Sequence, residues 1–296
     1  MRRSLIAVVG LVSVLAIAGT AQVAQAALIP PATASMLAWY KADAGLTLKG
    51  SATVTGWADQ SGNGYNLTSA GGLADANPKL VNVNFGPYAS GTMPTIDFSP
   101  SSYKLVSAAL TGQTVGTVLV MLKPSTTVTS TTATQTLLSF SSNSATNKAV
   151  AIGSFTSDLT NEYLTVRSGL STTVSGAVGT SGSVPFGNTI LASRFNSSTS
   201  HWNIYLGTGT ALNQVDNGYG SAQTLISPEV IGVGYNWGPN WKGQVAEILI
   251  YKTALSDTDL AAAQTYLSTK YGYTPEPATM AMLALGGLAL LRRRKV

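Results

Sequence analysis

The chain of 296 residues has no cysteine and only one histidine, and just 10% of its residues are charged. Without cysteine it can form no disulfide, and it offers neither a thiol nucleophile nor a thiolate metal ligand. A Ser-His-Asp triad would depend on His201, which begins an expected strand and has no nucleophile-elbow motif beside it. The stability of the fold must therefore come from a hydrophobic core, which a chain of this length can form.

Carboxylates are also scarce. Between the two terminal segments the chain has three glutamates, Glu162, Glu229 and Glu247. Glycoside hydrolysis normally uses two carboxylates that face each other across the scissile bond, and none of these glutamates begins a series of carboxylates along one strand. Glu247 stands alone in an apolar segment, where we expect it to accept structural hydrogen bonds. We predict no catalytic residues and no enzyme activity.

The positive charge of the chain lies in its ends. Of the 17 Lys and Arg residues, two lie in residues 1–26 and four in residues 274–296, which also hold one of the 12 Asp and Glu residues. The segment between them therefore has 11 basic and 11 acidic side chains and no net charge. Because no basic surface remains to neutralise phosphates, nucleic acid is not an expected partner.

Residues 1–26 have the pattern of a cleavable secretory signal. Arg2 and Arg3 precede an apolar run over residues 5–18, and Ala24-Gln25-Ala26 follows as an A-x-A cleavage site. A positive start, a short apolar helix and small residues at the cleavage site are typical of such signals. We therefore predict export, with the mature chain beginning after this site.

Residues 274–296 differ in composition from the rest of the chain. Pro275-Glu276-Pro277 interrupts regular structure because proline fixes φ and lacks an amide proton. The apolar residues 278–291 would form a helix of about 21 Å, shorter than the roughly 30 Å hydrocarbon core of a bilayer. Three arginines follow, Arg292, Arg293 and Arg294. The pattern predicts a short transmembrane helix with its positive end in the cytoplasm.

This order of a Pro-Glu-Pro motif, a Gly-containing apolar run and an arginine cluster resembles the PEP-CTERM protein-sorting domain. The resemblance implies an exported protein of a Gram-negative-type bacterium, held in the inner membrane until an exosortase, a membrane-embedded enzyme similar to cysteine proteases, processes it near the motif. The protein would then reach the cell envelope or the extracellular matrix. The alternative is an ordinary C-terminal membrane anchor.

The segment 27–273 predicts one all-β domain. Apolar stretches of strand length, such as residues 116–122 and 188–195, are separated by Gly, Asn and Ser. In residues 202–206, Trp, Ile and Leu alternate with Asn and Tyr, which is the period of a half-buried strand. Residues 246–251 are apolar on both faces, as in a central strand. Many short strands joined by turns favour an antiparallel β-sandwich.

One helix is expected at the end of the domain, packed on the sandwich. Ser256 is a good N-cap, and Gly272 can end the helix. The residues that recur on its apolar face are Leu260, Ala263, Leu267 and Tyr271. The Ser- and Thr-rich residues 125–146 instead predict an exposed loop region.

Four segments of the domain resemble a laminin-G-like, concanavalin A-like domain. They are LAWYKADAG at 37–45, WADQSGNG at 57–64, PTIDF at 94–98 and GQVAEILIY at 243–251. The resemblance implies a jelly-roll β-sandwich that binds carbohydrate or protein. Some relatives of this fold hydrolyse glucans, but the E-x-D-x-E pattern of laminarinase-type enzymes is absent from this chain.

Aromatic and amide side chains gather in residues 235–241. Exposed aromatic rings stack on sugars and amides hydrogen-bond to their hydroxyl groups, so this composition suits a carbohydrate site. The alternative is that Trp237, Trp241 or both fill the end of the core. The candidate ligand-binding residues are Tyr235, Asn236, Trp237, Asn240 and Trp241.

Residues 59–64 place oxygen-bearing side chains at alternate positions before a glycine, as the first half of a calcium loop does. Asp59, Ser61 and Asn63 would be the ligands of a Ca²⁺ ion. The twelfth position of such a loop, where a bidentate glutamate is required, is Ala70. The alternative, which we favour, is a tight turn in which Asp59 accepts backbone amides.

These features predict an exported, exosortase-sorted protein with a non-catalytic domain that binds extracellular polysaccharide or matrix. The expected partners are an exosortase, a polysaccharide and the inner membrane before processing, and Ca²⁺ is the one cofactor that the sequence suggests. A structural or adhesive surface protein with protein partners is the first alternative. A glycoside hydrolase-related domain is the second.

Overall fold

The structure is a computed structural model. It describes residues 28–70, 77–89, 91–99, 104–108, 110–124, 134–141, 150–158, 161–168, 177–178, 189–207, 213–216, 230–233 and 241–273. The predicted signal peptide and sorting tail both lie outside these residues. No helix in the described part is long and apolar enough to cross a membrane.

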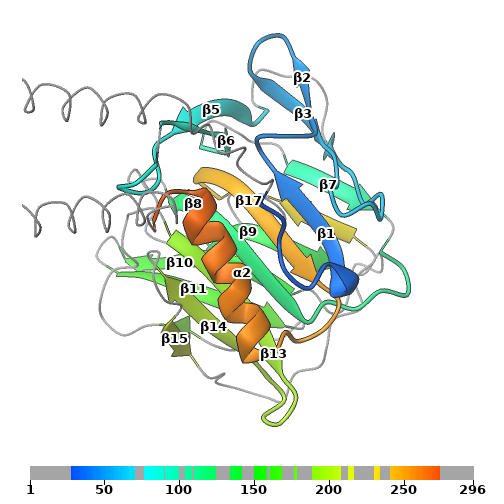
Figure 1. Ribbon diagram of the computed structural model, residues 1–296, viewed down its shortest axis with the longest axis vertical. Helices are drawn as coiled ribbons and strands as arrows, with labels where there is room; N and C mark the ends of the chain where they lie inside the picture. The colour runs from blue at the N-terminus through cyan, green and yellow to red at the C-terminus, as the bar shows by residue number, and fades with distance from the viewer. Residues whose placement is uncertain are drawn as a thin grey trace, which may run out of the picture.

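The described strands pair antiparallel into one curled sheet with two layers (Figure 1). The first layer runs in the order β1 (Met36–Lys41), β17 (Gly243–Tyr251), β8 (Thr117–Pro124), β13 (Thr189–Asn196), β14 (His201–Gly207) and β15 (Asn213–Asp216). The second layer runs in the order β2 (Leu46–Lys49), β3 (Thr53–Trp57), β4 (Leu67–Ala70), β7 (Lys104–Ala108), β16 (Val230–Val233), β9 (Thr134–Ser141), β10 (Val150–Asp158), β11 (Asn161–Ser168) and β12 (Ala177–Val178). This mostly β, antiparallel architecture with one C-terminal helix confirms the all-β, antiparallel part of the predicted fold class.

A hairpin of β5 (Lys79–Val83) and β6 (Met93–Asp97) connects the two layers. β6 pairs with the first residues of β17, and Lys79 of β5 pairs with Thr53 of β3. The connection explains why the pairings form a continuous sheet that curls over on itself.

The main hydrophobic core combines side chains from both layers. Strand alternation puts every second residue of β8 in this core, and the same is true of β14, where Trp202, Ile204 and Leu206 share its inner side as predicted. The second layer contributes Leu105, Leu138, Phe140, Ile231 and Val233. At about 25 cal/mol per Å² of buried apolar surface, such a core can stabilise the domain without disulfides.

A second core lies on the outer face of the first layer, beneath helix α2 (Asp257–Lys270) (Figure 1). Leu119 and Met121 of β8 point to this side, as do Ile190 and Ala192 of β13. The first layer is therefore buried on both faces, which explains why residues 246–251 are apolar on both sides of the strand apart from Glu247.

Helix α2 confirms the sequence prediction in detail. The Ser256 side chain accepts a hydrogen bond from the Asp259 amide at 3.1 Å, which is an N-cap. Gly272 ends the helical region with φ of +72°, a conformation that side chains with a Cβ rarely adopt. The four residues predicted for its apolar face, Leu260, Ala263, Leu267 and Tyr271, are all buried.

The prediction of an exposed loop region over residues 125–146 was wrong for residues 134–141. They form β9, which pairs with β10 and β16, and Leu137, Leu138 and Phe140 are buried. Thr is β-branched and suits strands, so a Ser- and Thr-rich composition does not exclude one when apolar residues lie between the polar ones.

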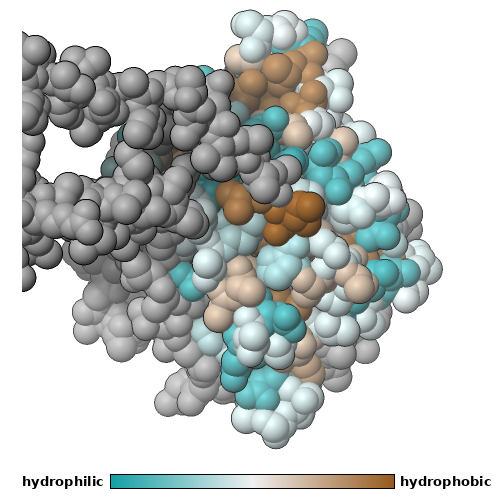
Figure 2. All heavy atoms as spheres, viewed as in Figure 1, coloured by the Kyte–Doolittle hydropathy of each residue, from teal (hydrophilic) through white to brown (hydrophobic). Residues whose placement is uncertain are grey.

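The surface on the α2 side mixes hydrophilic and hydrophobic residues (Figure 2). A hydrophobic area covers the β2–β3 hairpin, where Leu48 is 37% exposed. The other large hydrophobic side chains exposed in the described part are Leu28, Ile29 and Tyr88.

Candidate functional site

A β-bulge in β17 determines where Glu247 points. The register against β8 shifts between Val245 and Glu247, so Ala246 is an extra residue on β17. Ala246 packs in the core beneath α2, and Glu247 also bonds to α2, although neighbours on a regular strand face opposite sides. The bulge thus directs a carboxylate toward the helix.

The Glu247 carboxylate is completely buried and accepts hydrogen bonds from four side chains. Oε1 accepts from Trp39 Nε1 and from the Tyr266 hydroxyl, each at 2.6 Å. Oε2 accepts from Lys270 Nζ at 2.6 Å and from the Tyr271 hydroxyl at 2.8 Å. We call these five residues the Glu247 cluster; it joins β1, β17 and the end of α2.

Burial and the neighbouring carboxylate keep the two tyrosines of the Glu247 cluster protonated. Desolvation raises the pKa of Tyr266 and of Tyr271 well above the ordinary tyrosine value, and the negative charge of Glu247 raises both further. Both hydroxyl groups therefore remain donors at neutral pH. A buried carboxylate with this many donors is well compensated for its loss of hydration.

Lys270 also lies 3.1 Å from Asp43 Oδ2, so one ammonium bridges two carboxylates. Two carboxylates close to each other are also what glycosidases use. A catalytic carboxylate must reach substrate, however, and Glu247 has no exposed surface and is bonded through both oxygens. These contacts agree with the structural hydrogen-bonding role expected for Glu247.

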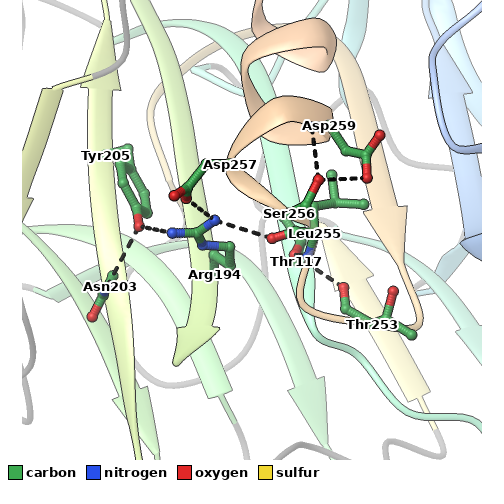
Figure 3. A network of polar contacts seen from close by, with 9 residues as sticks. All are labelled: Thr117, Arg194, Asn203, Tyr205, Thr253, Leu255, Ser256, Asp257 and Asp259. Carbon is green, nitrogen blue, oxygen red and sulfur yellow. Dashed lines mark hydrogen bonds and ion pairs between the residues drawn. The ribbon is translucent and has the colours of Figure 1, made fainter. Parts of the chain in front are cut away.

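Arg194 of β13 holds the other end of α2 (Figure 3). One guanidinium nitrogen donates to the Leu255 carbonyl at 3.0 Å and to Asp257 Oδ1 at 2.6 Å, and the other donates to the Tyr205 hydroxyl at 2.8 Å. Burial alone would lower the pKa of Arg194, but the hydrogen bonds and charge interactions with Asp257 and Tyr205 together outweigh this effect, so the pKa is raised. The contact secures the turn that precedes the helix.

Asp59 lies in a closely bonded turn. Its Oδ1 accepts the backbone amides of Trp39 at 2.9 Å and Ser61 at 2.8 Å. Its Oδ2 accepts the Ser61 hydroxyl at 2.8 Å and the Tyr65 amide at 3.2 Å. Both oxygens therefore have protein donors. This is the arrangement expected for a tight turn, which was the alternative to a calcium loop.

Asn63 strengthens the same turn. Its side-chain amide donates to the carbonyls of Met36 and Leu37, each at 3.0 Å, which joins the turn to β1. Gly62 and Gly64 have φ of +87° and +81°, as the turn requires. Calcium binding stays a prediction, and the described residues hold no group of three or more His, Cys, Asp or Glu side chains that could bind a metal ion.

Of the five candidate carbohydrate-binding residues, only Trp241 lies within the described residues. It is 2% exposed and packs edge-on against Phe98, with ring centroids 6.4 Å apart. The structure therefore gives Trp241 the core-filling role that the sequence left open. The other four, Tyr235, Asn236, Trp237 and Asn240, lie outside the described residues, as do the sorting residues Pro275 to Pro277 and Arg292 to Arg294.

The donors around Glu247 were not identified from the sequence. One signal was present, because an isolated glutamate in an apolar central strand requires buried donors. Near the end of the expected helix, Tyr266 and Lys270 are four residues apart and share a helix face, and Tyr271 follows directly. Whether the end of the helix contacts Glu247 of β17 depends on how the helix packs on the sheet. The sequence pattern does not specify this packing.

Comparison with known proteins identifies the C-terminal segment. Residues 274–295 match the family model of the PEP-CTERM protein-sorting motif, which confirms this part of the sequence prediction. The motif indicates an exported protein that is sorted by an exosortase to the cell envelope. No curated protein sequence matches the chain.

Several solved structures share the fold. Domain 4 of AbnA, an extracellular GH43 arabinanase from Geobacillus stearothermophilus solved in complex with arabinotriose, is 17% identical; the match covers 78% of this chain and 98% of that domain, with a TM-score of 0.51. An arabinofuranosidase complexed with arabinofuranosyl-alpha-1,2-xylobiose is 16% identical over 74% of this chain and 51% of its own, with a TM-score of 0.54. A GH54 α-L-arabinofuranosidase soaked with a cyclic sulfate inhibitor is also 16% identical, over 75% of this chain and 52% of its own, with a TM-score of 0.55.

The chain thus spans about half the length of the two arabinofuranosidases and nearly all of the arabinanase domain. At these identities the similarity establishes the fold alone.

Proposed function

We propose that the protein is an exported, exosortase-sorted component of the cell envelope whose β-domain binds carbohydrate and has no catalytic activity. Before processing, the apolar residues 278–291 hold it in the inner membrane with the domain outside. Afterwards the domain acts in the envelope or the extracellular matrix. The laminin-G-like assignment belongs to this proposal.

The observation that carries the carbohydrate part is the match to the arabinanase domain. It covers 98% of a domain whose structure contains arabinotriose. This support is for a sugar-binding module, because the shared unit is one domain and not a whole enzyme. Residues 235–241, rich in aromatic and amide side chains, are the segment whose composition suits sugar contacts.

The absence of catalysis is supported by the state of Glu247. Glu247 and Asp43 both contact Lys270, so they are a pair of neighbouring carboxylates. Glu247, however, is buried and bonded to four donors. Hydrolysis at this pair would require α2 to leave the sheet. The carboxylates therefore serve the fold in this proposal.

The test is co-sedimentation of the full chain, purified in detergent, with insoluble arabinan and with exopolysaccharide from the producing cells. We expect the chain to bind and Trp237→Ala to abolish the binding. The control Tyr88→Ala, which changes an exposed aromatic residue elsewhere, should leave the binding intact. Loss of binding in chelator, restored by Ca²⁺ but not in Asp59→Asn, would add a metal site. Absence of binding to either polysaccharide would overturn the carbohydrate proposal.

A structural or adhesive role with protein partners is the second candidate, and one observation favours it. Trp241 is buried, so only one of the two tryptophans of residues 235–241 remains available for stacking on a sugar. Absence of polysaccharide binding together with self-association or binding to another envelope protein would support this role.

A further inference from the structure

Backbone hydrogen bonds tie the chain that leaves α2 to the folded domain up to Tyr273, the last residue before the sorting segment. The Gly86 amide donates to the Tyr271 carbonyl at 3.0 Å, and the Tyr88 amide donates to the Gly272 carbonyl at 2.8 Å. The Tyr273 amide donates to the Ser268 carbonyl at 2.8 Å. Residues 85–89, which we call the strap, therefore bind the chain exit from α2.

The strap fits closely against the exit. A Cβ added to Gly86 would lie 2.1 Å from the Gly272 carbonyl oxygen, so the two backbones approach as near as glycine permits. Phe85 is buried and packs edge-on against Tyr271, with centroids 5.1 Å apart. Tyr271 itself belongs to the Glu247 cluster. The exit is thus fastened to both the strap and the sheet.

The tip of the strap faces solvent. Pro87 is exposed, and Tyr88 is 56% exposed. From β1 to the end of α2, the described part has one other large hydrophobic side chain that is exposed, Leu48, and it is less exposed than Tyr88. Tyrosine is enriched where membrane meets water, because its ring is apolar and its hydroxyl group polar. The strap tip thus has the chemistry of a membrane-interface residue and sits beside the exit of the chain.

Chain length limits how far the strap can be from a membrane. From Tyr273 to Ala278, where the apolar run begins, are five residues, which span at most about 17 Å when fully extended. The headgroup zone is about 5–7 Å thick on each side of the hydrocarbon core. If residues 278–291 are inserted, Tyr273 must lie at or near the headgroups, and so must the strap, which is bonded to the two residues before it, Tyr271 and Gly272.

We propose that the strap tip, Pro87 and Tyr88, docks on the outer leaflet of the inner membrane while the sorting segment is in place. This rests on the anchoring part of the proposed function. A single tyrosine binds a bilayer weakly, but the tether confines it beside the surface and gives it a high effective concentration there. Docking therefore depends on the tail and ends when processing separates the domain from it. It also holds the Pro275-Glu276-Pro277 motif against the membrane, where a membrane-embedded enzyme can reach it.

The experiment uses the absence of cysteine from the chain. Tyr88→Cys is labelled with an environment-sensitive fluorophore in the full chain, reconstituted in vesicles of phosphatidylethanolamine and phosphatidylglycerol with a nitroxide at headgroup depth. The matched control is Ser197→Cys in the exposed turn after β13, because Arg194 of that strand contacts the opposite end of α2. A helix of 14 residues separates the two ends by about 21 Å.

We expect quenching at position 88 to be several-fold stronger than at position 197. A second variant with a flexible Gly/Ser insertion of about 12 residues between Tyr273 and Pro275 should reduce quenching at 88 to the level at 197, since the reach of such a linker grows with its length. Equal quenching at 88 and 197 in the original chain overturns the docking. Near-ultraviolet circular dichroism confirms that each labelled variant remains folded.

Flotation of the vesicles separates this result from failure of the anchor. If the full chain does not float with vesicles, the membrane-anchoring proposal is overturned and the docking with it. If the chain floats and position 88 is not quenched, the docking alone is overturned.

Discussion

The two ends of helix α2 are fastened to the sheet by ion pairs of equal length in very different surroundings. At the C-terminal end, Lys270 Nζ lies 2.6 Å from a Glu247 carboxylate that is wholly buried. At the N-terminal end, Arg194 lies 2.6 Å from Asp257, whose side chain is 91% exposed. The distances are the same, but water surrounds only the second carboxylate.

The difference teaches that contact distance does not rank these pairs by their contribution to stability. An exposed pair is weakened by the high dielectric constant of water and contributes about 0–1 kcal/mol. A buried pair is strong in the interior but depends on all of its donors, because an uncompensated charge there is severely destabilising. The C-terminal end should therefore be much more sensitive to substitution.

The largest effect is expected for Glu247→Ala. It leaves Lys270 and the indole and phenol donors without their acceptor, so we expect a loss of about 3–5 kcal/mol in the free energy of unfolding. Urea denaturation followed by circular dichroism measures it. A loss no larger than that of Asp257→Ala would show that burial does not distinguish the two ends.

A double variant sharpens this result. Glu247→Leu combined with Lys270→Met replaces the buried pair by apolar groups. It should be less destabilising than the sum of the single changes, because each single change leaves one charge of the buried pair alone and the double change leaves none. Asp43, which is partly exposed, loses its lysine in Lys270→Met and in the double variant alike. Additive losses would mean that Glu247 and Lys270 act independently.

The next effect is alkaline unfolding. Because the folded pKa of Tyr266 and of Tyr271 lies above the unfolded value of about 10, the folded state retains protons that the unfolded state loses. The contribution of the two raised pKa values to the free energy of unfolding is fully present below pH 10. It is lost as pH rises above 10, by up to about 1.4 kcal/mol per pH unit for each tyrosine.

Stability measured between pH 9 and 11.5 should fall less steeply for the Tyr266→Phe, Tyr271→Phe double variant, although its stability at neutral pH is lower. Tyr88→Phe, at an exposed position, is the control and should keep the slope of the original chain. An unchanged slope in the double variant would contradict the assignment.

Arg194→Ala should have a moderate effect. It removes hydrogen bonds to the Leu255 carbonyl and the Tyr205 hydroxyl in addition to the exposed ion pair, so we expect a loss of about 1–2 kcal/mol. Arg194→Lys should recover only part of this, because a lysine cannot reproduce the planar fork. Complete recovery by lysine, measured by urea denaturation, would indicate that charge alone is responsible.

The smallest effect is expected for Asp257→Ala, below about 1 kcal/mol and decreasing further in high salt. Ser256→Ala at the N-cap is a useful comparison, with an expected loss of about 1 kcal/mol that salt does not remove. A salt-independent loss for Asp257→Ala would indicate a role beyond its exposed ion pair.

Local features of the fold could be predicted from the sequence because they depend on neighbouring residues. The N-cap at Ser256, the apolar face of α2 and the alternation of β14 all follow from short-range geometry. β9 was missed because its Ser and Thr residues are compatible with both loop and strand, and only pairing with β10 and β16 decides between them.

The candidate sites show the same division. The bonds of Asp59 to Ser61 and Tyr65 join residues a few positions apart, so a turn with backbone amides bound to one carboxylate could be predicted from the spacing alone. The bond of Asp59 to the Trp39 amide, 20 positions away, could not. The Glu247 cluster joins Trp39 to a residue 208 positions later and depends on a one-residue bulge. No local pattern contains that information.

The sequence by itself determined the sorting motif, the all-β class and the helix with its ends, because composition and short-range periodicity specify them. The secretory signal stays a prediction from the same kind of pattern. Only the tertiary structure decided that Trp241 fills the core, that Glu247 fastens α2 and that residues 85–89 hold the exit of the chain. These depend on contacts between distant segments, where burial and the need to satisfy every buried charge select one arrangement.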